Sequence, residues 1–140
     1  MIKFTKERSI SIDDVLHLYQ AVGWTNYTNQ PQMLEQALSH SLATYLARDG
    51  EEIVGLVRLV GDGFSSVFVQ DLIVLPSYQR QGIGSNLMKE ALADYKDAYQ
   101  IQLATEQTEK NLGFYRSLGF ETLSTYDCTG TIWLDRKKFK

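Results

Sequence analysis

The chain has 140 residues, 44% hydrophobic and 22% charged, which is typical of one soluble globular domain, and we expect that domain over residues 1–140. Its net charge of −3 argues against a nucleic-acid-binding protein, whose affinity would need a basic surface. A lone cysteine and two histidines without ligand-like spacing argue against a metal site.

The N-terminal stretch Met-Ile-Lys-Phe-Thr-Lys-Glu-Arg lacks the apolar core of a secretory signal. The longest apolar runs of the chain fall well short of the ~20 residues that span a bilayer. We therefore expect a cytoplasmic protein without a membrane partner.

The first part of the chain predicts a strand, two helices and a hairpin. Ile2 to Phe4 form the strand, one helix ends near Ala21, and a second begins at Pro31, since proline suits the first turn of a helix. The β-rich runs Leu42 to Arg48 and Ile53 to Val60 are joined through an Asp-Gly pair, a strong hairpin signal.

Residues 23–28 lie between the two helices and show neither a helical nor a strand period. They carry two large aromatic side chains, Trp24 and Tyr27. These rings either cover the edge of the core or face a substrate, because loops on a scaffold often carry binding function.

A buried strand, a polar turn and an amphipathic helix form the centre of the chain. Val67 to Leu75 is almost continuously apolar, and Pro76 ends it because proline offers no donor to a sheet. Gly82 and Gly84 then open a helix with one apolar stripe. Unpaired amides and the positive end of the helix dipole make such a start attractive to phosphate.

The last part of the chain predicts strands separated by a short helix. Ile101 to Ala104 forms a strand, which we expect to lie parallel to the preceding one because a helix connects them. Lys110 to Leu118 forms a helix, and strands follow at Phe120 to Leu123 and at Thr131 to Arg136. The element order is typical of a mixed α/β layer arrangement.

Three phosphate-binding motifs compete for the central turn, beside the structural alternative of a helix cap or a close packing point. No P-loop string is present, and Leu87 stands where a dinucleotide fingerprint needs its third glycine. The pattern Gln/Arg-x-x-Gly-x-Gly/Ala is matched by residues 79–84. In this context it resembles the acyl-CoA pyrophosphate loop of the GNAT superfamily of N-acetyltransferases.

A second string supports the same resemblance. Residues 111–120, Asn-Leu-Gly-Phe-Tyr-Arg-Ser-Leu-Gly-Phe, are similar to the family's helix that ends Phe/Leu-Tyr-x-x-x-Gly-Phe. The family tyrosine falls on Tyr115, which the resemblance makes the general acid for the departing CoA thiolate; otherwise it is a core aromatic. Many relatives place an asparagine seven residues earlier, but here Thr108 holds that position, and Asn111 stands closer.

The resemblance implies a GNAT-like α/β fold with a mixed, mostly antiparallel sheet, helices on both faces and a splay between the fourth and fifth strands. Main-chain groups at the end of the fourth strand would bind the pantetheine arm and stabilise the oxyanion, while the turn would hold the diphosphate. Arg80 and Lys110 are either phosphate contacts or surface charges. The residues expected to bind acetyl-CoA are Leu72, Ile73, Val74, Gln79, Arg80, Gln81, Gly82, Ile83, Gly84, Ser85 and Asn111.

The general base is not assigned. Asp71, Glu106 and His40 are candidates, and an ordered water chain is another. The resemblance implies an N-acetyltransferase that moves acetyl from acetyl-CoA to a primary amine by direct attack in a ternary complex, without a metal. The alternative on the same fold is a non-catalytic acyl-CoA sensor or interaction subunit.

The acceptor stays open among an arylalkylamine, a polyamine, a protein amine, an aminoglycoside and an amino acid. Homodimerisation is common in the family, and a strand edge or an apolar C-terminal surface of this chain could serve it.

Overall fold

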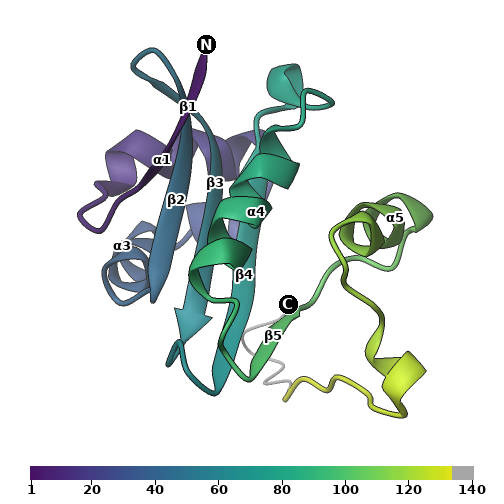
Figure 1. Cartoon of the computed structure of the whole chain (residues 1–140). Helices are drawn as coiled ribbons and strands as arrows, with labels where there is room; N and C mark the ends of the chain where they lie inside the picture. Colours follow the sequence, from purple (N-terminus) through teal and green to yellow (C-terminus); the bar gives the residue numbers. More distant parts are fainter. Residues whose placement is uncertain (134–140) are drawn as a thin grey trace. The chain divides into compact units, whose positions relative to one another are not determined.

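The computed structural model describes residues 1–133, which belong to two compact units, Met1–Thr105 and the described residues from Glu106 onward. Figure 1 labels the elements. The first unit contains β1 (Ile2–Lys6), α1 (Ile12–Ala21), α2 (Thr25–Thr28), α3 (Pro31–Ser39), β2 (Ala43–Asp49), β3 (Glu52–Gly61), β4 (Ser66–Val74), the 3-10 turn η1 (Pro76–Tyr78), α4 (Ile83–Asp94) and β5 (Gln100–Leu103). The second contains α5 (Glu109–Ser117) and the 3-10 turn η2 (Leu123–Tyr126).

The strands of the first unit form one five-stranded sheet in the order β1-β2-β3-β4-β5. Neighbours from β1 to β4 run antiparallel, and β4 and β5 run parallel, as the connecting helix predicted. The hairpin between β2 and β3 turns at Gly50, whose φ of 62° lies in the left-handed region that glycine adopts without strain. The predicted hairpin is confirmed.

The strands β4 and β5 separate after a short shared stretch. They pair from Ser66 with Gln100 to Val69 with Leu103, and β5 ends there while β4 continues to Val74. On its other side β4 stays paired with β3 up to Val74, which lies opposite Gly55. This parting is the predicted splay between the fourth and fifth strands.

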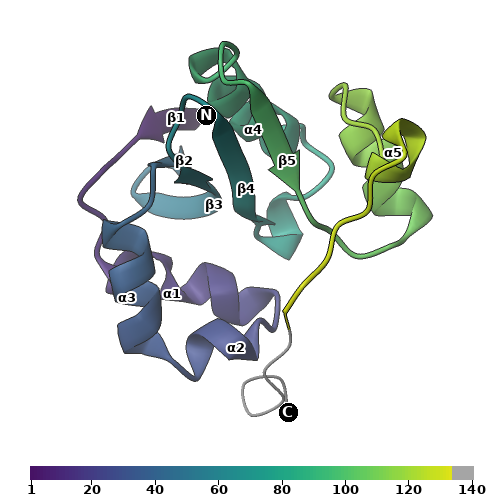
Figure 2. The ribbon, with the colours of Figure 1, turned by 90° about the horizontal axis from the view of Figure 1, so that it is seen from below.

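Helices cover both faces of the sheet, as predicted. Figure 2 shows α1, α2 and α3 on one face and α4 on the other. The first core joins buried side chains of α1 and α3, among them Leu18 and Leu34, to Leu56 of β3 and Ile73 of β4. The apolar stripe predicted for α4 is buried, at Ile83, Leu87, Met88 and Ala91.

The strand predicted at Phe120 to Leu123 was wrong, because the chain there turns into η2. Backbone hydrogen bonds from Thr125 N to Thr122 O (3.1 Å) and from Cys128 N to Leu123 O (3.0 Å) close this turn. The Thr122 hydroxyl lies 3.1 Å from that of Ser124, so local side-chain contacts compete with strand pairing. Residues 131–133 of the last predicted strand also lack strand structure, and residues 134–136 lie outside the described residues.

Within residues 1–133, no helix is long and apolar enough to cross a membrane.

Gly55 lets α4 approach the sheet closely, which provides a test of this packing. A Cβ at Gly55 would lie 3.1 Å from Leu87 Cδ1 and 3.3 Å from both Ile73 O and Ile83 Cγ2. We expect Gly55→Ala to lower the free energy of unfolding by about 1–3 kcal/mol, because it overpacks this contact. Chemical denaturation measures the change.

Gly113→Ala is the matched control. A Cβ at Gly113 would meet no atom within 4 Å, and the residue lies inside α5. Alanine there should leave stability unchanged or raise it by about 0.5–1 kcal/mol. An equal response of both variants would contradict the tight contact at Gly55.

Candidate active site

Among residues 1–133, the end of β4 has main-chain groups that are not paired with a strand on one side. Leu72, Ile73 and Val74 pair with β3, but among the described residues none of them has a partner in β5. Their side chains are buried or half-buried. An extended ligand could therefore bind along this edge as an added strand.

The turn after β4 is tied to the rest of the sheet at its start. The hydroxyl of Tyr78 donates to Asp49 Oδ2 at 2.6 Å, which joins η1 to the hairpin between β2 and β3. The hydrogen bond raises the pKa of Tyr78 to about 12, so the phenol stays a donor at neutral pH. Gln79 Nε2 donates to Val74 O at 3.1 Å. The side chain of Gln79 thus contacts the last carbonyl of β4.

The helix α4 begins without a side-chain cap. Arg80 and Gly82 have φ values of 65° and 79°, and this left-handed backbone brings the chain into the helix. Gly82 is the N-cap and forms no side-chain cap hydrogen bond. The main-chain bond from Asn86 N to Gly82 O (3.0 Å) is the first of the helix, so the amides of residues 83–85 precede it. This start suits an anion such as phosphate.

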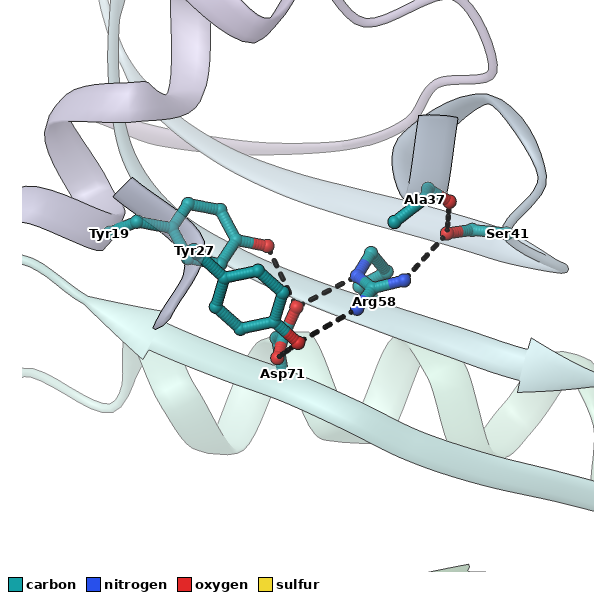
Figure 3. A network of polar contacts seen from close by, with 6 residues as sticks. All are labelled: Tyr19, Tyr27, Ala37, Ser41, Arg58 and Asp71. Carbon is teal, nitrogen blue, oxygen red and sulfur yellow. Dashed lines mark hydrogen bonds and ion pairs between the residues drawn. The ribbon is translucent and has the colours of Figure 1, made fainter. Parts of the chain in front are cut away.

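A buried ion pair lies directly before the open edge of β4. Arg58 of β3 and Asp71 of β4 face each other across the strands, and their side chains are 5% and 2% exposed. Arg58 Nε donates to Asp71 Oδ2 at 2.7 Å. Figure 3 shows this pair with its partners.

Two phenols complete the shell of the Asp71 carboxylate. Tyr19 of α1 donates to Oδ2 at 2.8 Å, and Tyr27 of α2 donates to Oδ1 at 2.9 Å (Figure 3). Burial raises the pKa of both phenols, and the charge of Asp71 raises it further, so both remain protonated donors. The carboxylate of Asp71 is enclosed and fully engaged, which argues against it as the general base.

The aromatic stretch expected as a loop contains the one-turn helix α2. Tyr27 is buried, and its hydroxyl is held by Asp71, so it covers the core rather than facing a substrate. Trp24 is half-buried, with ring centroids 6.1 Å from Tyr19 and 6.3 Å from Tyr27. Trp24 is therefore the less buried residue of the pair.

The other candidate bases have ordinary surface positions. His40 is the exposed C-cap of α3, with Nδ1 2.9 Å from Gln36 O. Glu106 is exposed, and its carbonyl accepts from Thr108 N at 2.9 Å. The base stays unassigned.

Tyr115 lies in α5 of the second unit, in an aromatic setting. Its ring centroid lies 5.0 Å from that of Phe114 and 5.9 Å from that of Phe120, both edge-on. Burial raises the pKa of the phenol. Within residues 106–133 no hydrogen bond engages its hydroxyl.

The structure gives a reason for the threonine at the position where many relatives have asparagine. Thr108 is the N-cap of α5, and its hydroxyl accepts from Asn111 N at 3.1 Å. The Asn111 side chain donates to Glu106 O at 3.4 Å. Both side chains therefore support the start of this helix.

The predicted cofactor-binding residues fall into both units. Those of β4 and of residues 79–85 lie together in the first unit, where the strand edge, turn and helix are consecutive. Asn111 and Tyr115 lie in the second. Sequence reasoning missed Arg58 and Tyr19; the signal was an arginine within the apolar run Ile53 to Val60, which implies a buried partner for its charge.

Comparison with known proteins identifies relatives of this chain. Residues 40–122 match the family model described as an acetyltransferase (GNAT) domain. A solved GNAT family acetyltransferase from Streptococcus pneumoniae TIGR4 is 74% identical, with a TM-score of 0.90 over 97% of this chain and 99% of that one. A GNAT acetyltransferase from Elizabethkingia anophelis, solved with acetyl-CoA bound, is 22% identical, with a TM-score of 0.63 over 86% and 76% of the two chains.

A curated relative is the chloroplastic serotonin N-acetyltransferase 2 of rice, Oryza sativa subsp. japonica. It is 33% identical over 95 residues, which are 65% of this chain and 48% of that protein. The chain spans about half the length of the first curated relatives that it matches.

The contact between Tyr78 and Asp49 predicts how the turn is held. We expect Tyr78→Phe to speed amide exchange in residues 79–85, because the turn loses its hydrogen bond to the β2–β3 hairpin. Hydrogen–deuterium exchange measures this. Tyr99→Phe is the control, since Tyr99 is 81% exposed and should leave exchange there unchanged. Unchanged exchange in Tyr78→Phe would show that this bond does not hold the turn.

Proposed function

Because the chain belongs to the GNAT acetyltransferase family, we propose that it is an N-acetyltransferase that transfers acetyl from acetyl-CoA to a primary amine. The observation that carries the proposal is the continuous path from the open edge of β4 to the uncapped start of α4. An extended, amide-bearing arm that ends in a diphosphate matches both features. The bound acetyl-CoA in the Elizabethkingia anophelis relative supports this ligand.

In the proposed complex, main-chain groups of Leu72, Ile73 and Val74 bind the pantetheine amides and the acetyl carbonyl. The diphosphate lies at the turn, where the amides of residues 81–85 and the positive end of the helix dipole favour it. Gln79 contributes by fixing the turn to Val74, and Arg80 and Asn111 are further proposed contacts to the cofactor.

The proposed reaction is a direct transfer. The neutral amine attacks the thioester carbonyl, its carbon–nitrogen bond forms, and the carbon–sulfur bond breaks as CoA thiolate leaves. A backbone donor of β4 stabilises the oxyanion, a type of contact worth about 3 kcal/mol in other acyl transfers. Tyr115 protonates the thiolate, and the amine loses its extra proton to a base that is not assigned. No acyl-enzyme is needed.

The acceptor is proposed only as a primary amine. The name of the rice relative, a serotonin N-acetyltransferase, supports an arylalkylamine among the candidate acceptors. A cytoplasmic location, a single domain over residues 1–140 and a homodimer remain predictions.

Acetyl-CoA binding is the direct test. Calorimetry should give saturable binding of acetyl-CoA and far weaker binding of S-acetylpantetheine, because the latter lacks the diphosphate that the start of α4 would hold. A thiol-release screen against primary amines then tests turnover. Absence of saturable acetyl-CoA binding would refute the proposal, whereas tight binding without turnover of any amine would favour the non-catalytic sensor.

Replacement of Tyr115 tests the acid. Tyr115→Phe should lower kcat by about 10²-fold to 10⁴-fold and leave acetyl-CoA affinity nearly unchanged, because only the proton donor is lost. Tyr126→Phe is the control, since Tyr126 lies in the same unit and is 68% exposed. Full activity of Tyr115→Phe would remove Tyr115 from the mechanism.

The pH profile gives a second readout of this acid. Burial raises the pKa of Tyr115 above the usual value of ~10, so the phenol keeps its proton as the pH rises through that range. We expect kcat to show no falling limb from this group below about pH 10. A wild-type falling limb below that pH that disappears in Tyr115→Phe would contradict the raised pKa.

A further inference from the structure

The buried cluster of Tyr19, Tyr27, Arg58 and Asp71 ends where the open edge of β4 begins. We propose that this carboxylate clamp is a positioning device that fixes the backbone of Leu72 to Val74 for the reaction. The inference rests on the proposed function of that segment. None of the four residues is assigned a contact with substrate or cofactor.

The segment needs a restraint besides sheet pairing. Beyond Val69, β4 has no partner in β5 among the described residues and is paired only with β3. That remaining ladder is irregular, since Arg58 pairs with Asp71 while Leu59 pairs with Val69, which leaves Gln70 as an extra residue in β4. An extra residue bends a strand and interrupts its ladder locally, so the pairing has to be re-established by the residues that follow it.

Asp71 sets the register again at the next residue. Its carboxylate meets the guanidinium of the cross-strand residue Arg58 at 2.7 Å, and both side chains are buried. A slip of β4 by one residue would turn Asp71 toward the opposite face and leave both charges buried without a partner. The ion pair therefore admits one register for the residues that follow.

The two phenols fix the orientation of that carboxylate from outside the sheet. Tyr19 and Tyr27 come from α1 and α2 and donate to different oxygens of Asp71. Tyr27 also accepts from Arg58 Nη2 at 3.1 Å, which closes the cluster. Ser41 accepts from Arg58 Nη1 at 3.2 Å and donates to Ala37 O at 2.6 Å. Figure 3 shows this network, in which Arg58 and Asp71 of the sheet contact side chains from the helices and from the segment after α3.

Stability alone is a weak reason for such a cluster. A buried ion pair that is replaced as a whole by apolar side chains often leaves a protein equally stable or more stable. What apolar side chains cannot supply is a directional set of hydrogen bonds that admits one backbone position. A role in fixing the backbone of Leu72 to Val74 therefore explains why polar side chains, rather than apolar ones, are buried here.

The test compares three phenol deletions in the full chain. Tyr19→Phe and Tyr27→Phe each remove one donor to Asp71 and keep the ring. Tyr45→Phe is the matched control: Tyr45 is 3% exposed and donates to Asp94 at 2.6 Å, in another part of the same unit. The readouts are the thermal midpoint, deuterium exchange in peptides covering residues 70–75, acetyl-CoA affinity and kcat.

We expect all three variants to lower the thermal midpoint, because each buried tyrosine loses the hydrogen bond that it donates to a carboxylate, and Tyr27 also loses the one that it accepts from Arg58. Only Tyr19→Phe and Tyr27→Phe should speed exchange in residues 70–75 and lower kcat, each by about tenfold, with acetyl-CoA affinity changed much less. The double variant Arg58→Met/Asp71→Leu should fold, exchange faster in residues 70–75 and have a lower kcat. It therefore provides the test if a single variant does not fold.

The proposal is overturned if Tyr19→Phe and Tyr27→Phe leave exchange in residues 70–75 and kcat as little changed as Tyr45→Phe does. It is also overturned if the double variant keeps the wild-type exchange rate and kcat. Failure of the proposed function is a separate result. A wild-type protein that binds no acetyl-CoA would refute the enzyme, while the exchange data would still decide whether the clamp fixes this backbone.

Discussion

Two opposite charges buried side by side in the middle of the sheet constrain the rest of the first unit. Arg58 and Asp71 lie on neighbouring strands, so their attraction specifies which residues of β3 and β4 stand opposite each other. Removing either partner alone would leave a buried charge, which is strongly destabilising. The hydroxyls of Tyr19 and Tyr27 donate to the carboxylate of this pair. These hydrogen bonds join α1 and α2 to β4, the strand that carries the open edge.

Much of the fold follows from local sequence signals. The Asp-Gly hairpin, the apolar stripe of α4 and the glycines at its start are short-range patterns, and each predicted its element. The strand expected at Phe120 to Leu123 failed because a short apolar run fits several backbone conformations. There the hydroxyls of Thr122 and Ser124 lie 3.1 Å apart, within the local turn that replaces the strand.

The candidate site was predictable to different degrees. Gly82 could be placed at a helix start because its role depends on its immediate neighbours. The partnership of Arg58 with Asp71 could not, because it depends on the extra residue Gln70, which shifts the pairing of β4 against β3. The roles of Tyr19 and Tyr27 depend further on how two helices pack over the sheet, and a single sequence contains no short pattern for that.

Within the part of the chain that the structure describes, β5 ends early and leaves β4 unpaired on one side beyond Val69. An extended ligand on that edge would supply the missing pairing and would act as a removable structural element. Because such a ligand binds only the folded chain, its concentration enters the folding equilibrium, and about a hundredfold excess over Kd adds roughly 2.7 kcal/mol to stability. The supply of ligand would then set the stability of the folded protein as well as its occupancy.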